Sequence, residues 1–365
     1  MNRKQIASSI FLGLLCISLV MPSLQATTTR KDALIDYVKS CETGSGFANT
    51  PEASGAILES TYHALYILDA YNDLGEIDEA SLIEWVNNCK NADYGFGNKE
   101  IDESDIISTY YACWIYDLFN VVMYNYTYIW VADLQNGSAG FADNSNVSEN
   151  IYATFHGIEA LTINGTDLSN NNVSTWLVER QNINPGSDGY GGFATDQNSS
   201  NMWATWAAIG SISRLNVLNQ ILTEPLVSWL NSSQNLNSYE DDYGAFSSKP
   251  GESDYGLLST FAAIYCLQKL GSSYLSRINL EAALTWLLDL QNEDGGFRVN
   301  SIDAASSLSA SYYAFAILDL LGERNRLESG VPWDPGFQIP LWGWILIGIG
   351  IILAAILIIK KYYLD

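Results

Sequence analysis

Two kinds of apolar segment alternate along the chain between about residue 30 and residue 325. The first kind is amphipathic, as in residues 32–39, where charged and apolar positions share the turns of a helix. The second kind is apolar nearly all round, as in residues 110–116, and a helix without a polar face is buried on every side. No segment keeps the strict alternation of a strand. The pattern therefore predicts an all-α protein in which a buried set of helices lies inside a solvated set.

The pair of segments repeats six times. Each amphipathic segment contains an aromatic residue and is followed by a Gly-Phe step or a variant, whose phenylalanines recur every 45 to 53 residues. The aromatic residues are Tyr37, Trp85, Trp130, Trp176, Trp229 and Trp286, and the phenylalanines are Phe47, Phe96, Phe141, Phe193, Phe246 and Phe297. Each apolar segment opens with a hydroxyl residue and an aromatic residue, at Thr61-Tyr62, Thr109-Tyr110, Thr154-Phe155, Thr205-Trp206, Thr260-Phe261 and Ser311-Tyr312. Six helical hairpins over residues 27–325 can close into an (α/α)6 toroid, although periodicity alone also allows an open superhelix.

The turn between the two segments of a repeat has its own pattern. In the last four repeats a glutamine follows the tryptophan by five residues, at Gln135, Gln181, Gln234 and Gln291. We expect the glycine to end the amphipathic helix in a left-handed conformation, and the phenylalanine to fold back onto the core. We also expect the glutamine to bind backbone groups of the turn and to hold adjacent repeats together. These residues are interpreted as fold residues and not as a site.

The string Gln-x-x-x-Gly-Gly-Phe with a tryptophan upstream, at residues 286–297, resembles the repeat of the squalene cyclase and protein prenyltransferase β-subunit superfamily. The resemblance covers about residues 30–325 and implies a closed toroid. Prenyltransferase β subunits bind zinc through Asp-x-Cys at the start of an inner helix and a histidine in a Tyr-His step. Tyr62-His63 matches that step, and Phe155-His156 is similar. No cysteine here has an aspartate two residues before it, and Ser108 and Tyr110 stand at the corresponding place in repeat two.

The other catalytic patterns of the superfamily are also missing from the sequence. No basic cluster stands at the starts of the inner helices to hold a diphosphate, and there is no Asp-x-Asp-Asp acid of the squalene-cyclase type. The Gly-Cys-Gly-Glu-Gln of complement-type thioester proteins, which share the toroid, is absent. The resemblance thus implies the fold without these catalytic residues. It predicts no metal and leaves open whether the protein is an enzyme.

Two sets of residues are candidates for a site. His63 and His156 occupy the same repeat position, where the other repeats have Tyr111, Ala207, Ala262 and Tyr313. If this position faces the lumen, His63, Tyr111, His156 and Tyr313 form a hydrogen-bonding wall, and the two alanines leave room opposite. The alternative is that these are core residues between the two rings, with each histidine satisfied by a neighbour.

The second set is a group of carboxylates, one before or at the start of each inner helix: Glu59, Asp105, Glu149, Asp196, Asp254 and Asp303. Helix capping and dipole compensation are the favoured explanation. An acidic rim that binds Ca²⁺ or supplies a hydrolytic acid/base pair is the alternative. No Asp-x-Asp-x-Asp-Gly loop supports a calcium site, so no cofactor is predicted.

Both ends of the chain carry sorting signals. Arg3, Lys4, the apolar residues 6–20 and Ala26 predict a signal peptide over residues 1–26. Residues 341–359 have no charge and are followed by Lys360 and Lys361, which predicts a membrane helix with residues 360–365 in the cytoplasm. A proline-containing linker, residues 326–340, joins it to the toroid. Within this linker 335–337 (Pro-Gly-Phe) also resembles an archaeal surface-sorting signal, in whose family the tail is removed, so retention of the membrane helix stays open.

Further features fit a single-pass protein with its toroid outside the cell. Seven Asn-x-Ser/Thr sites predict glycosylation, at Asn125, Asn136, Asn146, Asn164, Asn172, Asn198 and Asn231. An oxidising location would suit a disulfide between Cys41 and Cys89, which end adjacent outer helices. The net charge of −24 repels nucleic acid and excludes it as a partner.

These observations support three hypotheses of function. The first is a non-catalytic binding or adhesion module for an extracellular protein, glycan or lipid. The second is a glycan-active enzyme that uses rim carboxylates, for which two carboxyl groups about 5 to 10 Å apart in the lumen would be evidence. The third is a divergent prenyltransferase or terpenoid cyclase, which a continuous aromatic-lined cavity would favour.

Overall fold

The computed structural model describes residues 28–333 except 136, 138, 169–171 and 196–198. The following lie outside the described residues: the predicted signal peptide, membrane helix and cytoplasmic tail, residues 334–340 of the linker, Asn136, Asn198 and Asp196. In the part that is described, no helix has the length and apolarity needed to cross a bilayer. The chain forms two compact units, of which one is residues 31–326. In the other, residues 28–30 and 327–333 are joined by backbone hydrogen bonds from Arg30 to Ser329 (2.9 Å) and from Val331 to Thr28 (3.1 Å).

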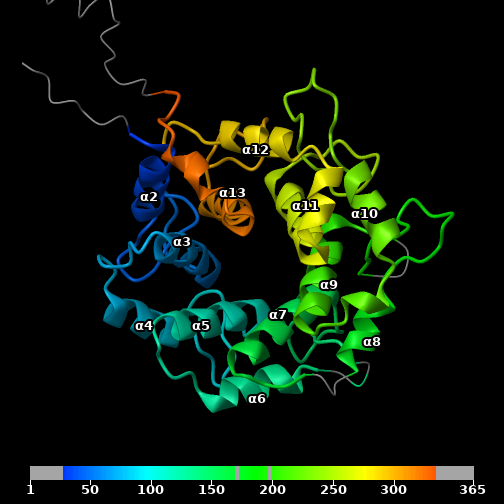
Figure 1. The fold of residues 1–365 in the computed structure, drawn as a ribbon. Coiled ribbons are helices and arrows are strands. Elements are labelled where there is room, and N and C mark those ends of the chain that lie inside the picture. The colour runs from blue at the N-terminus through cyan, green and yellow to red at the C-terminus, as the bar shows by residue number, and fades with distance from the viewer. Residues whose placement is uncertain (1–27, 136, 138, 169–171, 196–198, 334–365) are drawn as a thin grey trace, which may run out of the picture. The chain divides into compact units, whose positions relative to one another are not determined.

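Twelve α-helices follow one another in the described part of the chain, alternating between an outer and an inner layer (Figure 1). The outer helices are α2 (Arg30–Ser40), α4 (Glu79–Asn88), α6 (Asn125–Asp133), α8 (Val173–Val178), α10 (Thr223–Ser232) and α12 (Leu280–Asp289). The inner helices are α3 (Leu58–Ala70), α5 (Ile106–Leu118), α7 (Ile151–Ile163), α9 (Met202–Arg214), α11 (Leu257–Leu270) and α13 (Leu308–Leu321). Three short 3-10 helices, η1 (Leu218–Gln220), η2 (Ser272–Arg277) and η3 (Arg324–Glu328), lie between or after them.

The inner helices close a ring. Each packs against the next, and α13 packs against α3 (Figure 1). The closing contact has the same form as the internal ones, because the first inner-helix residue donates its backbone N–H to a loop carbonyl of the next repeat. Leu58 donates to Asn98 (2.8 Å), and at the closure Leu308 donates to Asn49 (2.7 Å). The predicted all-α toroid is therefore confirmed, and an open superhelix is excluded.

The recurring hydroxyl residue joins the Gly-Phe turn to the inner helix. In every repeat the backbone N–H of the phenylalanine donates to this hydroxyl at 2.9 to 3.0 Å. The hydroxyl in turn donates to the carbonyl four residues before it. All six phenylalanine side chains are fully buried. This pairing satisfies backbone groups that would otherwise be buried without a partner.

The glutamine links adjacent repeats, as predicted. Gln234 Nε2 donates to the carbonyls of Gly244 and Asn279, both at 2.9 Å, and its Oε1 accepts from the Asn279 N–H at 2.8 Å. Asn279 is the N-cap of α12, the outer helix of the next repeat. Gln181 makes the same three bonds to Gly191 and Leu222.

The predicted role of the glycine before the phenylalanine is wrong. Outer helices such as α4 end in a right-handed residue, Cys89, and not at a left-handed glycine. The glycine instead leaves room for the aromatic residue of the next outer helix. A Cβ on Gly95 would lie 2.8 Å from the Trp130 ring, and one on Gly296 would lie 2.7 Å from the Tyr37 ring. Only hydrogen fits there, because real Cβ atoms do not approach so closely.

The predicted disulfide is absent. Cys41 and Cys89 are both buried free thiols. They occupy matching places in neighbouring repeats, and packed helices lie roughly 8–10 Å apart. A disulfide requires Cα atoms roughly 4.4–6.8 Å apart, whereas each thiol is buried at the end of its own outer helix, Cys41 after α2 and Cys89 after α4.

The surface carries the predicted glycan acceptors and an ion-paired C-terminal turn. Asn125, Asn146, Asn164 and Asn172 are exposed and Asn231 is half-buried, which leaves glycosylation a prediction.

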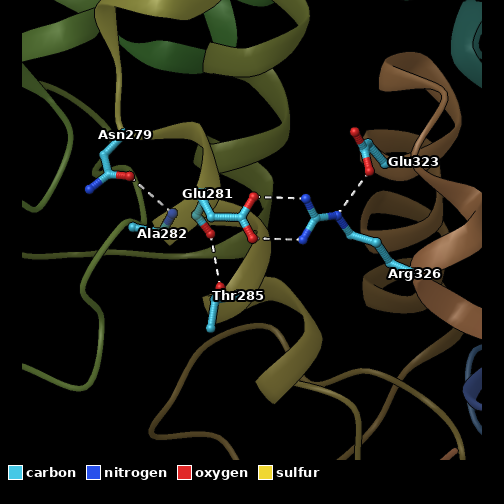
Figure 2. Close-up of polar contacts among 6 residues, drawn as sticks. All are labelled: Asn279, Glu281, Ala282, Thr285, Glu323 and Arg326. Carbon is cyan, nitrogen blue, oxygen red and sulfur yellow. Dashed lines mark hydrogen bonds and ion pairs between the residues drawn. The ribbon is translucent and has the colours of Figure 1, made fainter. Parts of the chain in front are cut away.

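After α13, Arg326 donates to both carboxylate oxygens of Glu281 on α12, at 2.9 and 2.7 Å, and to Glu323 at 3.0 Å (Figure 2). These contacts connect the end of the inner layer to the outer helix of the same repeat.

Candidate functional site: an aromatic cavity inside the ring

The inner helices enclose a cavity of about 250 Å³. Every one of them contributes the aromatic residue that follows the hydroxyl: Tyr62, Tyr110, Phe155, Trp206, Phe261 and Tyr312. We call these six residues the aromatic belt. The recurring hydroxyl side chain of each inner helix points toward the Gly-Phe turn of its own repeat. The residue that follows it is rotated by roughly 100° about the helix axis. The bond that fixes the hydroxyl therefore directs each ring of the belt into the lumen.

The four residues predicted for the lumen, His63, Tyr111, His156 and Tyr313, all line the cavity. The expected open side opposite them is not there. Ala207 and Ala262 are fully buried and are not among the lining residues. Trp206 and Phe261 cover that side, because the position before the alanines also faces inward.

The two histidines differ in their hydrogen bonds. His63 is 1% exposed, stacks on Tyr312 with ring centres 4.2 Å apart, and has no partner for its Nδ1 among the described residues. His156 Nδ1 pairs with the Tyr152 carbonyl at 2.8 Å. Burial lowers the pKa of His63 to about 3 and that of His156 to about 4. Both imidazoles are therefore neutral near pH 7.

The tyrosines of the wall are neutral as well. Burial raises the pKa of Tyr62, Tyr110, Tyr111 and Tyr312 well above the usual value. The hydroxyls of Tyr62 and Tyr312 lie 3.1 Å apart, and one donates a hydrogen bond to the other. The wall thus offers aromatic faces and neutral hydroxyls.

The two ends of the cavity differ. Toward the starts of the inner helices, the Trp203 ring of α9 lies 4.9 Å from Trp206 and 5.8 Å from Tyr313 of α13. Since α11 separates α9 from α13, this contact reaches across the ring and covers that end. Toward the helix ends, the lining continues to Glu159 and Asp319, which are 13% and 21% exposed. We call the end of the cavity at which these two carboxylates lie, toward the C-terminal ends of the inner helices, the mouth.

Both carboxylates at this mouth are paired. Glu159 accepts from Arg214 at 2.9 and 2.5 Å. Asp319 accepts from Arg324 Nε at 2.6 Å and from the Tyr66 hydroxyl at 2.8 Å. Neither acid was among the residues predicted from the sequence to line the lumen. Helical spacing could have indicated Glu159, because it follows His156 by three residues and therefore lies on the same face of the helix.

Of the six carboxylates predicted as a rim, the five that the structure describes, Glu59, Asp105, Glu149, Asp254 and Asp303, do not line the cavity. Asp105 is the N-cap of α5 and accepts from Ser108 at 2.8 Å. Asp254 accepts a loop N–H at 3.0 Å, and Asp303 accepts from Asn300 at 3.0 Å. Burial, followed by the charge of Asp105, raises the pKa of Glu59. Glu149 precedes the cap of α7, and Glu59 lies in the first turn of α3, so the described acids lie in caps, loops and a first helical turn at the starts of the inner helices.

Comparison with known proteins identifies this architecture. Residues 3–194 and 190–333 match the prenyltransferase alpha-alpha toroid domain. The chain belongs to this family.

Individual relatives are distant. Over 117 residues the chain is 29% identical to the protein farnesyltransferase subunit beta of Pyricularia oryzae, and it spans only 22% of the length of that protein. That stretch is 32% of this chain. The fold resembles Candida albicans protein geranylgeranyltransferase-I complexed with GGPP, with a TM-score of 0.65, 17% identity, and coverage of 82% of this chain and 93% of that one. It also resembles the type II terpene cyclase MstE from Scytonema, with a TM-score of 0.54, 11% identity, and coverage of 84% and 100%.

The residues around His63 do not suit the zinc ion that the resemblance to prenyltransferases implies. Its neighbouring rings are tyrosines, among them Tyr111 and Tyr313, and a zinc site needs further histidine, thiolate or carboxylate ligands. Nowhere in the described residues do three such side chains gather closely enough to hold a metal. Cys113 on α5 is a buried thiol whose pKa burial raises to about 12, which disfavours the thiolate that binds zinc.

Proposed function

We propose that this member of the prenyltransferase toroid family is a non-catalytic binding protein that holds an uncharged apolar molecule in its central cavity. The observation that carries the proposal is the aromatic belt, which lines the cavity from all six inner helices. Apolar, largely preformed cavities with few polar groups are typical of small-molecule sites. An apolar cavity of roughly 150 Å³ already admits benzene, so the volume of about 250 Å³ here admits more than one ring or several isoprenoid carbons.

The charges around the cavity support a neutral ligand. The wall histidines and tyrosines are uncharged, and the arginines nearest the mouth, Arg214 and Arg324, are bound to Glu159 and Asp319. A buried diphosphate would find no free basic partner on this wall, and burial of an unpaired charge costs several kcal/mol, roughly. Transfer of a prenyl group from a diphosphate is therefore not the activity that these residues support.

A divergent terpenoid cyclase is the second candidate, because aromatic faces also stabilise cations. Protonation of an alkene requires an acid in its neutral form. Glu159 and Asp319 are the carboxyl groups on the wall, and the oxygens of both already accept hydrogen bonds, from Arg214 and from Arg324 and Tyr66 respectively. The same pairing leaves neither of them free as the acid of a glycan hydrolase.

We further propose that the ring lies outside the cell and that residues 341–359 anchor it to the membrane. The support comes from the sequence: the signal peptide of residues 1–26, the charge-free stretch of residues 341–359, and the seven acceptor asparagines. A ligand in an external ring would come from the extracellular space or from the outer face of the membrane.

A cavity-filling substitution tests the binding function. Ala316 on α13 lines the cavity and is 5% exposed. We expect Ala316→Phe, in the full chain held in lipid nanodiscs, to weaken binding of farnesene at least tenfold, because the added ring occupies the space of the ligand. Titration calorimetry measures the affinity.

The same change at Ala53, an exposed turn residue, is the matched control and should leave the affinity unchanged. Farnesene that does not bind the wild-type chain, or that binds Ala316→Phe as well as the wild type, contradicts the proposed function. Cyclic products formed from farnesene would instead favour the second candidate.

A further inference from the structure

Five large apolar or aromatic side chains are exposed around α6, one of the outer helices (Figure 1). They are Tyr94, Val122, Tyr124, Tyr126 and Ile129, and we call them the α6 patch. Val122 is 90% exposed and Tyr126 is 61% exposed. A single exposed apolar residue is ordinary, but a contiguous exposed patch marks a surface that something else covers.

Contacts between its side chains make the α6 patch contiguous. The rings of Tyr94 and Tyr126 lie 4.9 Å apart, centre to centre. Lys90 Nζ lies 5.0 Å from the centre of the Tyr94 ring and 5.3 Å from that of the Tyr124 ring. The Tyr124 hydroxyl donates to Asn87 Oδ1 at 3.1 Å. The rings are therefore held in place, so a group that packs on them has little side-chain entropy to overcome.

Asn125 stands at the centre of the α6 patch. It lies between Tyr124 and Tyr126 in the chain, and Ile129 follows it by four residues, which places Ile129 beside it on the same face of α6. Asn125 is itself exposed. With Tyr126 and Thr127 it forms an Asn-x-Thr acceptor for an N-linked glycan. A glycan attached at this position would lie among the exposed rings.

The other acceptors that the structure describes have different surroundings. None of them has an aromatic residue next to it in the sequence: Asn146, Asn164, Asn172 and Asn231. Asn164 is the C-cap of α7, and it is exposed together with Gly165 and Thr166. It is therefore a reference acceptor within the same molecule, without an aromatic surface in its sequence.

Thr127 determines when Asn125 can be modified. Its side chain is fully buried, and its Oγ1 donates to the Tyr94 carbonyl at 2.9 Å. Because this hydroxyl is part of the acceptor motif, it is accessible only before α6 packs onto the turn that contains Tyr94. A glycan on Asn125 would thus be present already when the α6 patch forms.

We infer that an N-linked glycan on Asn125 covers the α6 patch, with the C–H faces of its first sugars on the rings of Tyr126 and Tyr94. Sugar rings present apolar C–H groups on their faces, and tyrosine offers a large apolar surface at low conformational cost. The bulk of the glycan also keeps the patch from association with other protein surfaces. The inference rests on the proposed location of the ring outside the cell and is independent of the ligand in the cavity.

The rate at which the glycan is released from the native protein tests this contact. The full chain is expressed in a eukaryotic secretory host, and glycopeptide mass spectrometry follows release at Asn125 and Asn164 by peptide-N-glycosidase. We expect release at Asn125 to be slower by roughly twofold to tenfold, the factor that one aromatic contact gives. In the denatured chain the two rates should be equal, because the rings no longer hold the glycan.

Variants assign the protection to particular rings. Tyr126→Ala keeps an Asn-x-Thr acceptor, and Tyr94→Ala leaves the acceptor untouched. Both should bring the release rate at Asn125 close to that at Asn164. Tyr239→Ala, the same change at an exposed tyrosine of repeat five, should leave the difference as it is. Circular dichroism melting shows whether each variant is folded.

The outcomes separate this inference from the proposed location. If neither Asn125 nor Asn164 carries a glycan, the proposed location fails and the inference fails with it. If Asn164 is glycosylated and Asn125 is not, the inference alone is overturned, and a dimer that Tyr126→Ala separates would identify a second copy as the cover of the patch. Equal release rates in the native wild type, or slow release that persists in both tyrosine variants, also overturn it.

Discussion

His63 and His156 show how much a single side chain depends on its neighbours. They share a repeat position, yet one stacks between tyrosines with a free Nδ1, and the other is anchored to a carbonyl of its own helix. Burial disfavours the imidazolium at both positions. Their low pKa is a property of the closed ring, and in the unfolded chain both imidazoles would take up a proton at the ordinary pKa of about 6.5.

This burial predicts a pH dependence of stability. The unfolded His63 takes up a proton below a pKa of about 6.5, whereas the folded one does so only near a pKa of about 3. The unfolded state therefore binds more protons between these values, and stability falls as the pH drops from 6.5 toward 3. By pH 4 the contribution of His63 to this loss is roughly 3 kcal/mol, at about 1.4 kcal/mol per pKa unit.

Urea unfolding of the wild type and H63F at pH 7 and pH 4 measures this contribution. The drop in unfolding free energy should be smaller in the variant, because phenylalanine does not titrate. Equal drops in the two proteins would show that His63 is not held neutral by the fold.

At the scale of the elements, each helix depends on groups from another repeat. The starts of the inner helices bind loops of the next repeat, the glutamines bind the next outer helix, and the glycine before each buried phenylalanine faces the next aromatic residue. Repeat five has Ala245 at this glycine position, where its methyl group is fully buried. A hairpin alone would leave these groups exposed or unpaired, so the elements stabilise one another around the ring.

Substitution of two asparagines tests whether the contact that closes the ring stabilises the protein as much as a contact between two consecutive repeats. Asn49 Oδ1 accepts from Ser309 at the closure (3.0 Å), and Asn98 Oδ1 accepts from Glu59 at an internal contact (3.1 Å). We expect Asn49→Ala and Asn98→Ala to lower the unfolding free energy by similar amounts, about 1 kcal/mol each. Each should leave a single cooperative transition.

Denaturant unfolding followed by fluorescence gives both values, with the wild type as reference. A closure that did not form in solution would make Asn49→Ala harmless. It would also leave the amides of α2 and α13 less protected from hydrogen exchange than those of α7.

For the whole molecule, the location remains a prediction because the residues that decide it lie outside the described range. With residues 341–359 in a membrane and residues 360–365 in the cytoplasm, the ring should be accessible to protease added to whole cells. Deglycosylation should raise its mobility on a gel. A ring that is protected from protease and unchanged by deglycosylation would place it inside the cell and remove the case for an extracellular ligand.

The sequence by itself determined the helical class, the six repeats and the residues that hold them together, because these follow from local spacing. Hydrophobic periodicity predicts helices, and a residue that recurs in every repeat, such as Thr61 and its equivalents, reports a contact that every repeat must make. The prediction that His63 lies in the wall of the lumen also followed from its position within the repeat. The resemblance in the Gln-x-x-x-Gly-Gly-Phe string supplied the closed ring, which periodicity alone does not require.

Only the tertiary structure decided what the cavity is. The aromatic belt was visible in the sequence as a repeated pair, yet whether those rings faced the lumen or the outer layer depended on the direction of the hydroxyl beside them. The pairing of Glu159 with Arg214 joins α7 to α9 across 55 positions of the chain, and that of Asp319 with the Tyr66 hydroxyl joins α13 to α3 across 253. The unpaired Nδ1 of His63 and the free thiols of Cys41 and Cys89 likewise depend on how the repeats pack together. Spacing along a chain reports which face a residue occupies, but charge compensation and unpaired atoms depend on groups that meet only when the ring closes.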